Sequence, residues 1–181
     1  MTSSGSPPQG RTSFRLPYPK GFMRILFRFP ILIYRLHLGW LLGKRFLLLE
    51  HRGRKSGKLK YAVIEVVDRD PDGRSYVVAA AWGAQSDWFK NILITPRVYV
   101  TVSTTRFPAA SEKITPHEAE RYLHTYSVRN PFAFKQIGSL LIGQGAHTTD
   151  EIIRAFVDSV PFVKFSPIRE GDYGISPKAS Y

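Results

Sequence analysis

A short basic segment in the first third of the chain carries the residue types best suited to binding an anion. Glycine permits positive φ and lets a backbone approach a bound group closely. Backbone N–H groups, a serine hydroxyl and several cations in one turn can together hold a phosphate or a carboxylate. An ordinary hairpin turn with solvated lysines explains the same residues equally well. The residues concerned are Arg52, Gly53, Arg54, Lys55, Ser56, Gly57, Lys58 and Lys60.

The segment is not a Walker A phosphate loop. Gly53 and Gly57 are one residue too close for that motif, and Leu59 stands where it requires serine or threonine. The apolar runs on either side, Phe46–Leu49 and Ala62–Val67, are typical of strands and not of the helix that a Walker A loop opens. The sequence therefore predicts a strand, a tight basic turn and a returning strand.

Small and aromatic residues follow about twenty positions later and indicate a second kind of surface. Ala79, Ala80 and Ala81 leave room for a flat ring, and Trp82, Trp88 and Phe89 can enclose one. With the basic turn, they suit a cofactor that has a planar ring and an anionic tail. The simpler interpretation, which these residues alone favour, is that Trp88, Phe89, Ile92 and Leu93 form the buried face of a short helix.

Several kinds of catalysis find no support in the sequence. The chain has no cysteine, so it offers no thiolate nucleophile and no thiolate metal site, and this composition fits a reducing, cytoplasmic interior. Its serines lack the context of a nucleophile elbow. No metal site is predicted, because metal-ligand spacing is missing among the five histidines, His37, His51, His117, His124 and His147.

The positive charge is concentrated at one end of the chain. Residues 1–60 contain 13 Lys or Arg and the single acid Glu50, whereas residues 61–181 contain 13 of each sign. This asymmetry indicates an anionic partner for the first third: a membrane surface, an acidic cofactor or nucleic acid. We do not expect nucleic acid, because the basic residues alternate with apolar ones and no nucleic-acid motif is present.

Three segments are expected. Residues 1–19 are rich in Ser, Pro and Gly and predict a disordered tail without the apolar region of a signal peptide. Residues 20–44 predict a basic amphipathic helix, divided at Pro30 and too interrupted by charge to span a bilayer. Its cations lie within an arc of roughly 80°, which suits a membrane interface. Residues 45–181 form one globular domain.

That domain has the pattern of an α+β fold. Strands are expected at Ser75–Trp82, Val98–Ser103, Phe107–Ile114 and Val160–Pro167, in addition to the two beside the basic turn. Helices are expected from Ser86 to Ile94, from the capping box at Thr115 to Val128, and over 131–142 and Thr149–Ser159. Mainly antiparallel strands with helices outside them can close into a small barrel.

Specific motifs resemble the deazaflavin-dependent nitroreductases, also called coenzyme F420-dependent quinone reductases. The resemblance covers most of residues 15–125. It rests on Arg52-Gly-Arg-Lys-Ser-Gly57, Glu65-Val-Val67, Tyr76-Val-Val-Ala79, Gly83, Ser86-Asp-Trp-Phe-Lys-Asn91, Pro96, Val98 and Val100.

The resemblance implies a split β-barrel of the FMN-binding type, in some members a homodimer. It also implies coenzyme F420, with hydride transfer to a quinone or nitroaromatic acceptor at the inner face of the cell membrane. Arg54, Lys55 and Ser56 match the family's anion-binding positions, with Lys60 as a helper. Ala79, Ala80, Ala81, Trp82 and Gly83 match the segment that lines the ring, and Asp87, Trp88, Phe89 and Asn91 match the helix that closes over it. No catalytic residue is implied.

Three hydroxyl groups common in the family are missing here. Ala80 and Phe89 replace a hydroxylated residue each, and Lys60-Tyr61-Ala62 replaces Arg-x-Thr. Two alternatives therefore stay open: FMN as the cofactor, and a binding protein for a flavin or quinone without turnover.

Overall fold

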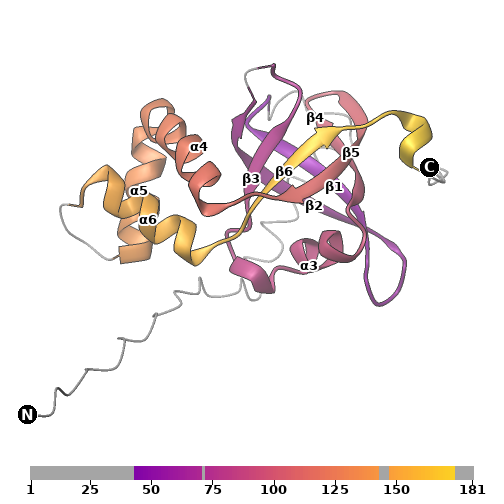
Figure 1. Cartoon of the computed structure of the whole chain (residues 1–181), viewed down its shortest axis with the longest axis horizontal. Coiled ribbons are helices and arrows are strands. Elements are labelled where there is room, and N and C mark those ends of the chain that lie inside the picture. Colours follow the sequence, from indigo (N-terminus) through magenta and orange to yellow (C-terminus); the bar gives the residue numbers. More distant parts are fainter. Residues whose placement is uncertain (1–42, 71, 143–146, 174–181) are drawn as a thin grey trace, which may run out of the picture.

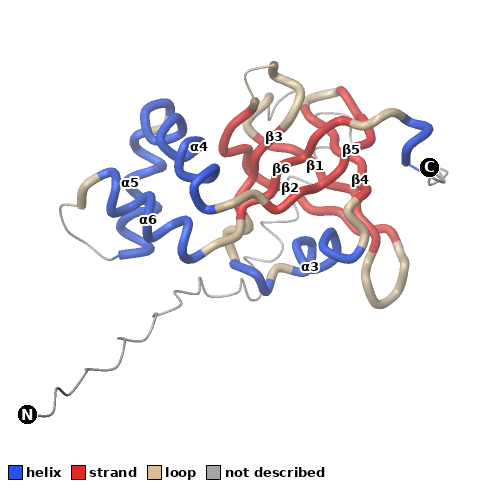
Figure 2. Tube along the Cα trace, in the orientation of Figure 1, coloured by secondary structure: helices blue, strands red, loops and turns tan. Residues whose placement is uncertain are grey.

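Six antiparallel strands close into one barrel, as Figures 1 and 2 show. The computed structural model describes residues 43–70, 72–142 and 147–173. Around the barrel the strands follow the order β1-β2-β3-β6-β5-β4. Their bounds are β1 (Phe46–Arg52), β2 (Leu59–Arg69), β3 (Tyr76–Ala79), β4 (Arg97–Val102), β5 (Thr105–Lys113) and β6 (Phe162–Pro167).

The helices lie outside this barrel in two places. In Figure 1, α4, α5 and α6 gather on one side, whereas α3 lies across the lower end. Helix α3 packs against β1 and β2. The bounds are α3 (Asp87–Ile94), α4 (Pro116–Arg129), α5 (Pro131–Ile142) and α6 (Thr149–Ser159), with short 3-10 turns at η2 (Gly83–Gln85) and η3 (Glu170–Tyr173). The predicted α+β split barrel with outer helices is confirmed.

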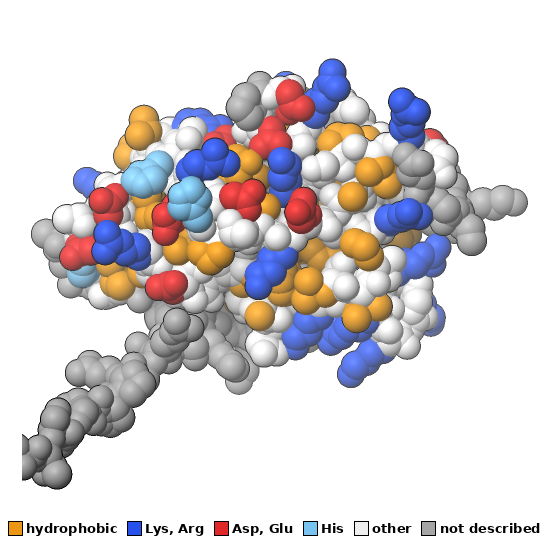
Figure 3. Space-filling view, viewed as in Figure 1, with side chains coloured by type: hydrophobic (Ala, Val, Ile, Leu, Met, Phe, Trp, Pro, Cys, Tyr) orange, Lys and Arg blue, Asp and Glu red, His pale blue; other side chains and the backbone are white. Residues whose placement is uncertain are grey.

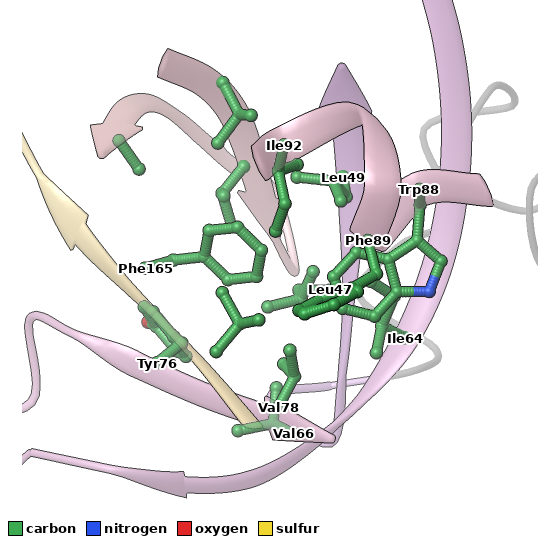
Figure 4. Close-up of a cluster of buried hydrophobic side chains, with 14 of the residues drawn as sticks. Leu47, Leu49, Ile64, Val66, Tyr76, Val78, Trp88, Phe89, Ile92 and Phe165 are labelled. Carbon is green, nitrogen blue, oxygen red and sulfur yellow. The ribbon is translucent and has the colours of Figure 1, made fainter. Parts of the chain in front are cut away.

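Alternating residues of the strands face two separate cores. Leu47 and Leu49 of β1 point into the barrel, where Phe165 of β6 and the α3 side chains Phe89 and Ile92 meet them (Figure 4). A second core lies between the barrel wall and the outer helices, and it is formed by residues such as Val67, Val77, Leu123, Ile153 and Phe156. Because side chains alternate along a strand, one barrel wall serves both cores.

The outer helices begin at strong local signals. The predicted capping box of α4 is confirmed: the Glu118 N–H donates to Thr115 Oγ1, and the Glu118 carboxylate accepts from the Thr115 N–H. Helix α6 has the same arrangement between Thr148 and Glu151, which we did not predict. None of the helices in the described ranges is both long and apolar enough to cross a bilayer.

Three details of the prediction are wrong. The third strand ends at Ala79 and not at Trp82, because Gly83 takes a φ of +69° and its N–H donates to the Ala80 carbonyl, which turns the chain. Ser86 precedes α3, but its hydroxyl donates to the Gly83 carbonyl and does not cap the helix. Leu93 is 56% exposed, because it lies on the face of α3 away from the barrel.

The two N-terminal predictions fall mostly outside the described residues. The expected tail (1–19) lies there entirely. Of the expected helix (20–44), only Gly43 and Lys44 are described, and they form part of a turn.

Candidate functional site

A cavity of about 570 Å³ opens at the end of the barrel where α3 lies. The turn between β1 and β2, the beginning of β2 and the first half of α3 form its walls. Figure 3 shows basic side chains gathered along the lower edge of the molecule, at the end where α3 lies in Figure 1. The lining residues are His51, Gly53, Arg54, Lys55, Ser56, Lys60, Tyr61, Ala62, Trp82, Ser86, Asp87, Trp88 and Asn91.

The basic turn is closed by its own backbone. The Gly53 N–H donates to the Lys58 carbonyl (2.9 Å), and the Gly53 carbonyl accepts from the N–H groups of Ser56 and Gly57. Only Gly57 has a positive φ, +64°. At Gly53 a Cβ would lie 3.1 Å from Ser56 Oγ, a tight contact that requires the serine side chain to shift by a few tenths of an ångström. Of the two glycines in the turn, Gly57 therefore adopts the positive φ that glycine permits, and Gly53 does not.

Helix α3 holds this turn through Arg54. The Arg54 backbone N–H and its Nη1 both donate to Asn91 Oδ1 at 3.0 Å, and Nη1 also pairs with Asp87 Oδ1 at 3.0 Å. Asn91 Nδ2 in turn lies 3.1 Å from His51 Nδ1. Three predicted site residues, Arg54, Asp87 and Asn91, thus engage one another and fix the turn against the helix.

The lysines that line the cavity, unlike Arg54, have no partner for their ammonium groups among the described residues. The Lys55 and Lys60 side chains are exposed, and neither ammonium group forms an ion pair or hydrogen bond within the part of the chain that the structure describes. Among the described residues, Asp87 is the only carboxylate that lines the cavity, and it is already paired with Arg54. The described lining therefore carries a net positive charge, and two ammonium groups can face a ligand.

Aromatic residues also line the cavity. Trp82 and Trp88 line the cavity together with Tyr61 and Ala62. The indole of Trp88 also packs edge-on against the Phe89 ring, with 6.0 Å between the ring centroids. Trp88 therefore belongs both to the barrel core and to the cavity wall, so the two alternative roles of the short helix are compatible.

The remaining predicted ring-binding positions lie elsewhere. Phe89 (4% exposed) and Ala80 (0%) are buried in the barrel core, and Figure 4 shows the Phe89 ring directed into that core. Ala79, Ala81 and Gly83 do not line the cavity either. The structure thus brings eight predicted residues together at the cavity: Arg54, Lys55, Ser56, Lys60, Trp82, Asp87, Trp88 and Asn91.

Five lining residues were not predicted as site residues: His51, Gly53, Tyr61, Ala62 and Ser86. For His51 the sequence did contain a signal. It continues the alternation of Leu47 and Leu49, which places an ionisable side chain on the inward face of a strand. Such a residue at a strand end is a reasonable candidate for a site.

The His51 imidazole is held in its neutral form. Burial lowers its pKa to about 4, and it outweighs the opposing effects of the Arg52 backbone and the Asp87 charge. The side chain is 4% exposed. At neutral pH the ring therefore carries a single proton.

Lowering the pH from 7 to 5 should reduce the free energy of unfolding by about 2 kcal/mol through His51 alone. The folded-state pKa lies below the ordinary value of 6.5, so between the two values the unfolded chain binds the proton more readily. Stability is therefore lost as the pH falls through this window. Urea unfolding at both pH values measures the change, and His51→Asn should lose this component while other groups titrate as before. An equal pH dependence in both proteins would contradict the prediction.

Comparison with known proteins gives a family. The family model described as "F420H(2)-dependent quinone reductase" matches residues 35–138, more than half of the chain. No curated protein sequence matches.

Several solved structures are similar to this chain at low sequence identity. One is titled "Structure of F420-H2 Dependent Reductase (FDR-A)": 16% identical, it covers 68% of this chain and 96% of its own, with a TM-score of 0.47. A conserved hypothetical protein from Mycobacterium tuberculosis is 14% identical. The match covers 75% of this chain and 80% of the other protein, with a TM-score of 0.49. A pyridoxamine 5'-phosphate oxidase-related, FMN binding protein from Nostoc punctiforme is 11% identical. The match covers 78% of this chain and 80% of the other protein, with a TM-score of 0.44. On the family match, the chain belongs to the F420H(2)-dependent quinone reductase family, and it is an oxidoreductase whose coenzyme is F420.

Proposed function

We propose that the cavity binds reduced coenzyme F420 and that the protein reduces a quinone there, with nitroaromatic compounds as further acceptors. In this proposal Lys55, Lys60 and the Ser56 hydroxyl hold the anionic tail. Trp82 and Trp88 enclose the ring system. When bound, the reduced coenzyme supplies a hydride, and the acceptor takes it up.

One observation carries this proposal: cations without partners and an aromatic wall occur in the same cavity. Lys55 and Lys60 offer ammonium donors to phosphate or carboxylate, and the indoles of Trp82 and Trp88 offer flat apolar surface. The donor set and the wall match the two chemical halves of the coenzyme. The lysines alone, or the tryptophans alone, would not support the proposal.

The protein's own contribution is positioning and electrostatics. The Arg54–Asp87–Asn91 contacts fix the turn before any ligand arrives, so little order has to be gained on binding. The aromatic wall keeps water away from one side of the cavity, which protects a hydride donor from competing reactions. Orientation of two rings, and not acid or base catalysis, is the main effect we expect.

The missing hydroxyl groups weaken this proposal little. Ala80 and Phe89 lie in the core, so a hydroxyl at either position would be buried among apolar side chains. Only Ala62 lines the cavity. This arrangement removes much of the reason for the alternative, a non-catalytic or FMN-using binding protein.

A fluorescence titration with F420, and in parallel with FMN, tests the cofactor site. We expect saturable F420 binding at concentrations well below those that FMN requires. Turnover of the reduced coenzyme is then followed with a naphthoquinone and with a nitroaromatic compound. F420 binding without turnover of either acceptor would support the non-catalytic alternative, and tighter FMN binding would overturn the F420 site.

We also propose peripheral contact with an anionic membrane, the place where a lipid-soluble quinone is found. The amphipathic pattern of residues 20–44 supports it. Within the described residues, Leu93 and Ile94 are 56% and 69% exposed at the end of α3, between Lys90 and Arg97 in the chain. Apolar residues flanked by cations suit an anionic lipid surface.

Removing residues 1–44 should abolish flotation with vesicles that contain anionic lipid, because the basic stripe is lost. The full chain should float with anionic vesicles and not with neutral ones, and added salt should weaken the binding. A matched variant, Leu93→Ser with Ile94→Ser, measures the contribution of α3 to vesicle binding independently of the N-terminal segment. If the truncated protein still floats, residues 1–44 are not the anchor.

The predicted homodimer is tested on the same preparations by sedimentation velocity.

A further inference from the structure

Two polar side chains are buried beneath the basic turn, where apolar residues would be expected. His51 at the end of β1 and Asn91 in α3 are each 4% exposed. Burying polar groups is costly unless they are hydrogen-bonded, and these two satisfy each other across 3.1 Å, from Asn91 Nδ2 to His51 Nδ1. The pair joins a barrel strand to the helix that lies over the barrel end.

The direction of each hydrogen bond follows from the partners of Asn91. Its Oδ1 accepts from the Arg54 backbone N–H and from Arg54 Nη1, both at 3.0 Å, and these groups can only donate. The amide orientation is therefore fixed, and Nδ2 must donate to His51 Nδ1. That nitrogen must then be unprotonated, so the imidazole carries its proton on Nε2, an assignment made from the network.

We propose that His51 is a positioning residue for the coenzyme site: its Nδ1 holds the Asn91 amide, which in turn holds Arg54 and the basic turn in the shape that binds an anion. The ligand in this inference rests on the proposed function, whereas the positioning itself does not. His51 acts through Asn91 and needs no contact with the ligand.

The alternative arrangement of the network is blocked. If Nδ1 were protonated, its N–H would face the Asn91 NH₂ group, so two donors would meet. Rotating the Asn91 amide by 180° would turn its NH₂ group toward the N–H groups of Arg54, which are also donors. The charged groups that act on His51 are Lys60, its cross-strand partner on β2, and Asp87 on α3, and the ring also interacts with the Arg52 backbone. The Lys60 charge opposes a second proton on the ring and Asp87 favours one, but burial decides for the neutral form.

Two substitutions at His51 test the inference. Leucine removes the acceptor and leaves the Asn91 NH₂ group buried without a partner. Asparagine keeps an acceptor, because its Oδ1 can occupy the position of Nδ1. We expect His51→Leu to raise both the hydrogen-exchange rate of the Arg54 amide and the Kd for F420 about tenfold, and His51→Asn to restore most of both.

The two readouts separate this inference from the proposed function. If the wild type does not bind F420 but the Arg54 amide responds as expected, the proposed function fails and the positioning role stands. Unchanged Arg54 exchange in a folded His51→Leu protein overturns the positioning role, whatever the coenzyme does. If His51→Leu does not fold, imidazole ¹⁵N spectra of the wild type at pH 7 decide: protonated Nε2 supports the network, and protonated Nδ1 overturns it.

Discussion

Replacing Lys55 and Lys60 together by alanine should raise the Kd for coenzyme F420 about a hundredfold. Each substitution removes a charge-assisted contact to the anionic tail, worth roughly 1.5 kcal/mol at an exposed site. Two such losses correspond to about two factors of ten in the Kd. Fluorescence titration at low and high salt measures the effect, and the dependence on salt should weaken as well, because the contacts are ionic.

Lys58→Ala is the matched control for these lysines. Lys58 lies in the same basic turn but does not line the cavity, so its removal changes the net charge without removing the proposed contact. We expect a Kd within about threefold of the wild type, since the remaining effect is long-range and screened. If Lys58→Ala and the single variant Lys55→Ala lose equal affinity for F420, the turn acts only through its overall charge. An unchanged Kd in the double variant would contradict the tail site.

Arg106→Leu should lower the free energy of unfolding by about 3 kcal/mol, the largest stability effect that we predict outside the apolar cores. Arg106 binds the Glu50 carboxylate through Nε (2.6 Å) and Nη2 (3.1 Å), and its guanidinium lies 3.6 Å from the centre of the Tyr99 ring. Glu50 is only 8% exposed. The variant therefore leaves a carboxylate buried without its cation. Urea unfolding monitored by tryptophan fluorescence measures the loss.

The chain offers a matched control for this ion pair as well. Arg45 pairs with Glu65 at 3.1 Å, but these side chains are 60% and 39% exposed. Arg45→Leu should therefore cost less than about 1 kcal/mol. A double variant, Arg106→Leu with Glu50→Leu, should recover part of the loss because no buried charge is left unpaired. Equal losses in Arg106→Leu and Arg45→Leu would show that burial of Glu50 does not matter.

The secondary structure was predictable because its signals are local. Turn residues separate the strands, and the capping box at Thr115 marks the first residue of α4 to within one position. The strand predicted from Ser75 was expected to end three residues too late, because Ala80–Trp82 carries no turn signal before Gly83. The order of strands around the barrel, and the position of β6 between β3 and β5, depend on contacts distant in the chain that no local pattern contains.

The candidate site was predicted in part for a similar reason. The basic turn and the first half of α3 carry their own motifs, and the structure places them around one cavity. Which residues of a motif face that cavity depends on the rotation of α3 against the barrel. That rotation directs Phe89 into the core and Trp88 to the boundary between core and cavity. It also brings Asn91 onto His51, a contact between residues 40 positions apart.

The position of β6 also constrains how the protein can be made by the ribosome. The described residues that line the cavity lie between His51 and Asn91, yet the barrel around them stays open until β6 (Phe162–Pro167) has been synthesised. At roughly 5–20 residues per second, the intervening 70 or so residues leave β3 and β5 without their shared neighbour for several seconds. During this interval the nascent chain exposes two strand edges that can pair with other chains. Efficient production should therefore depend more on chaperone capacity during translation than the stability of the finished barrel would suggest.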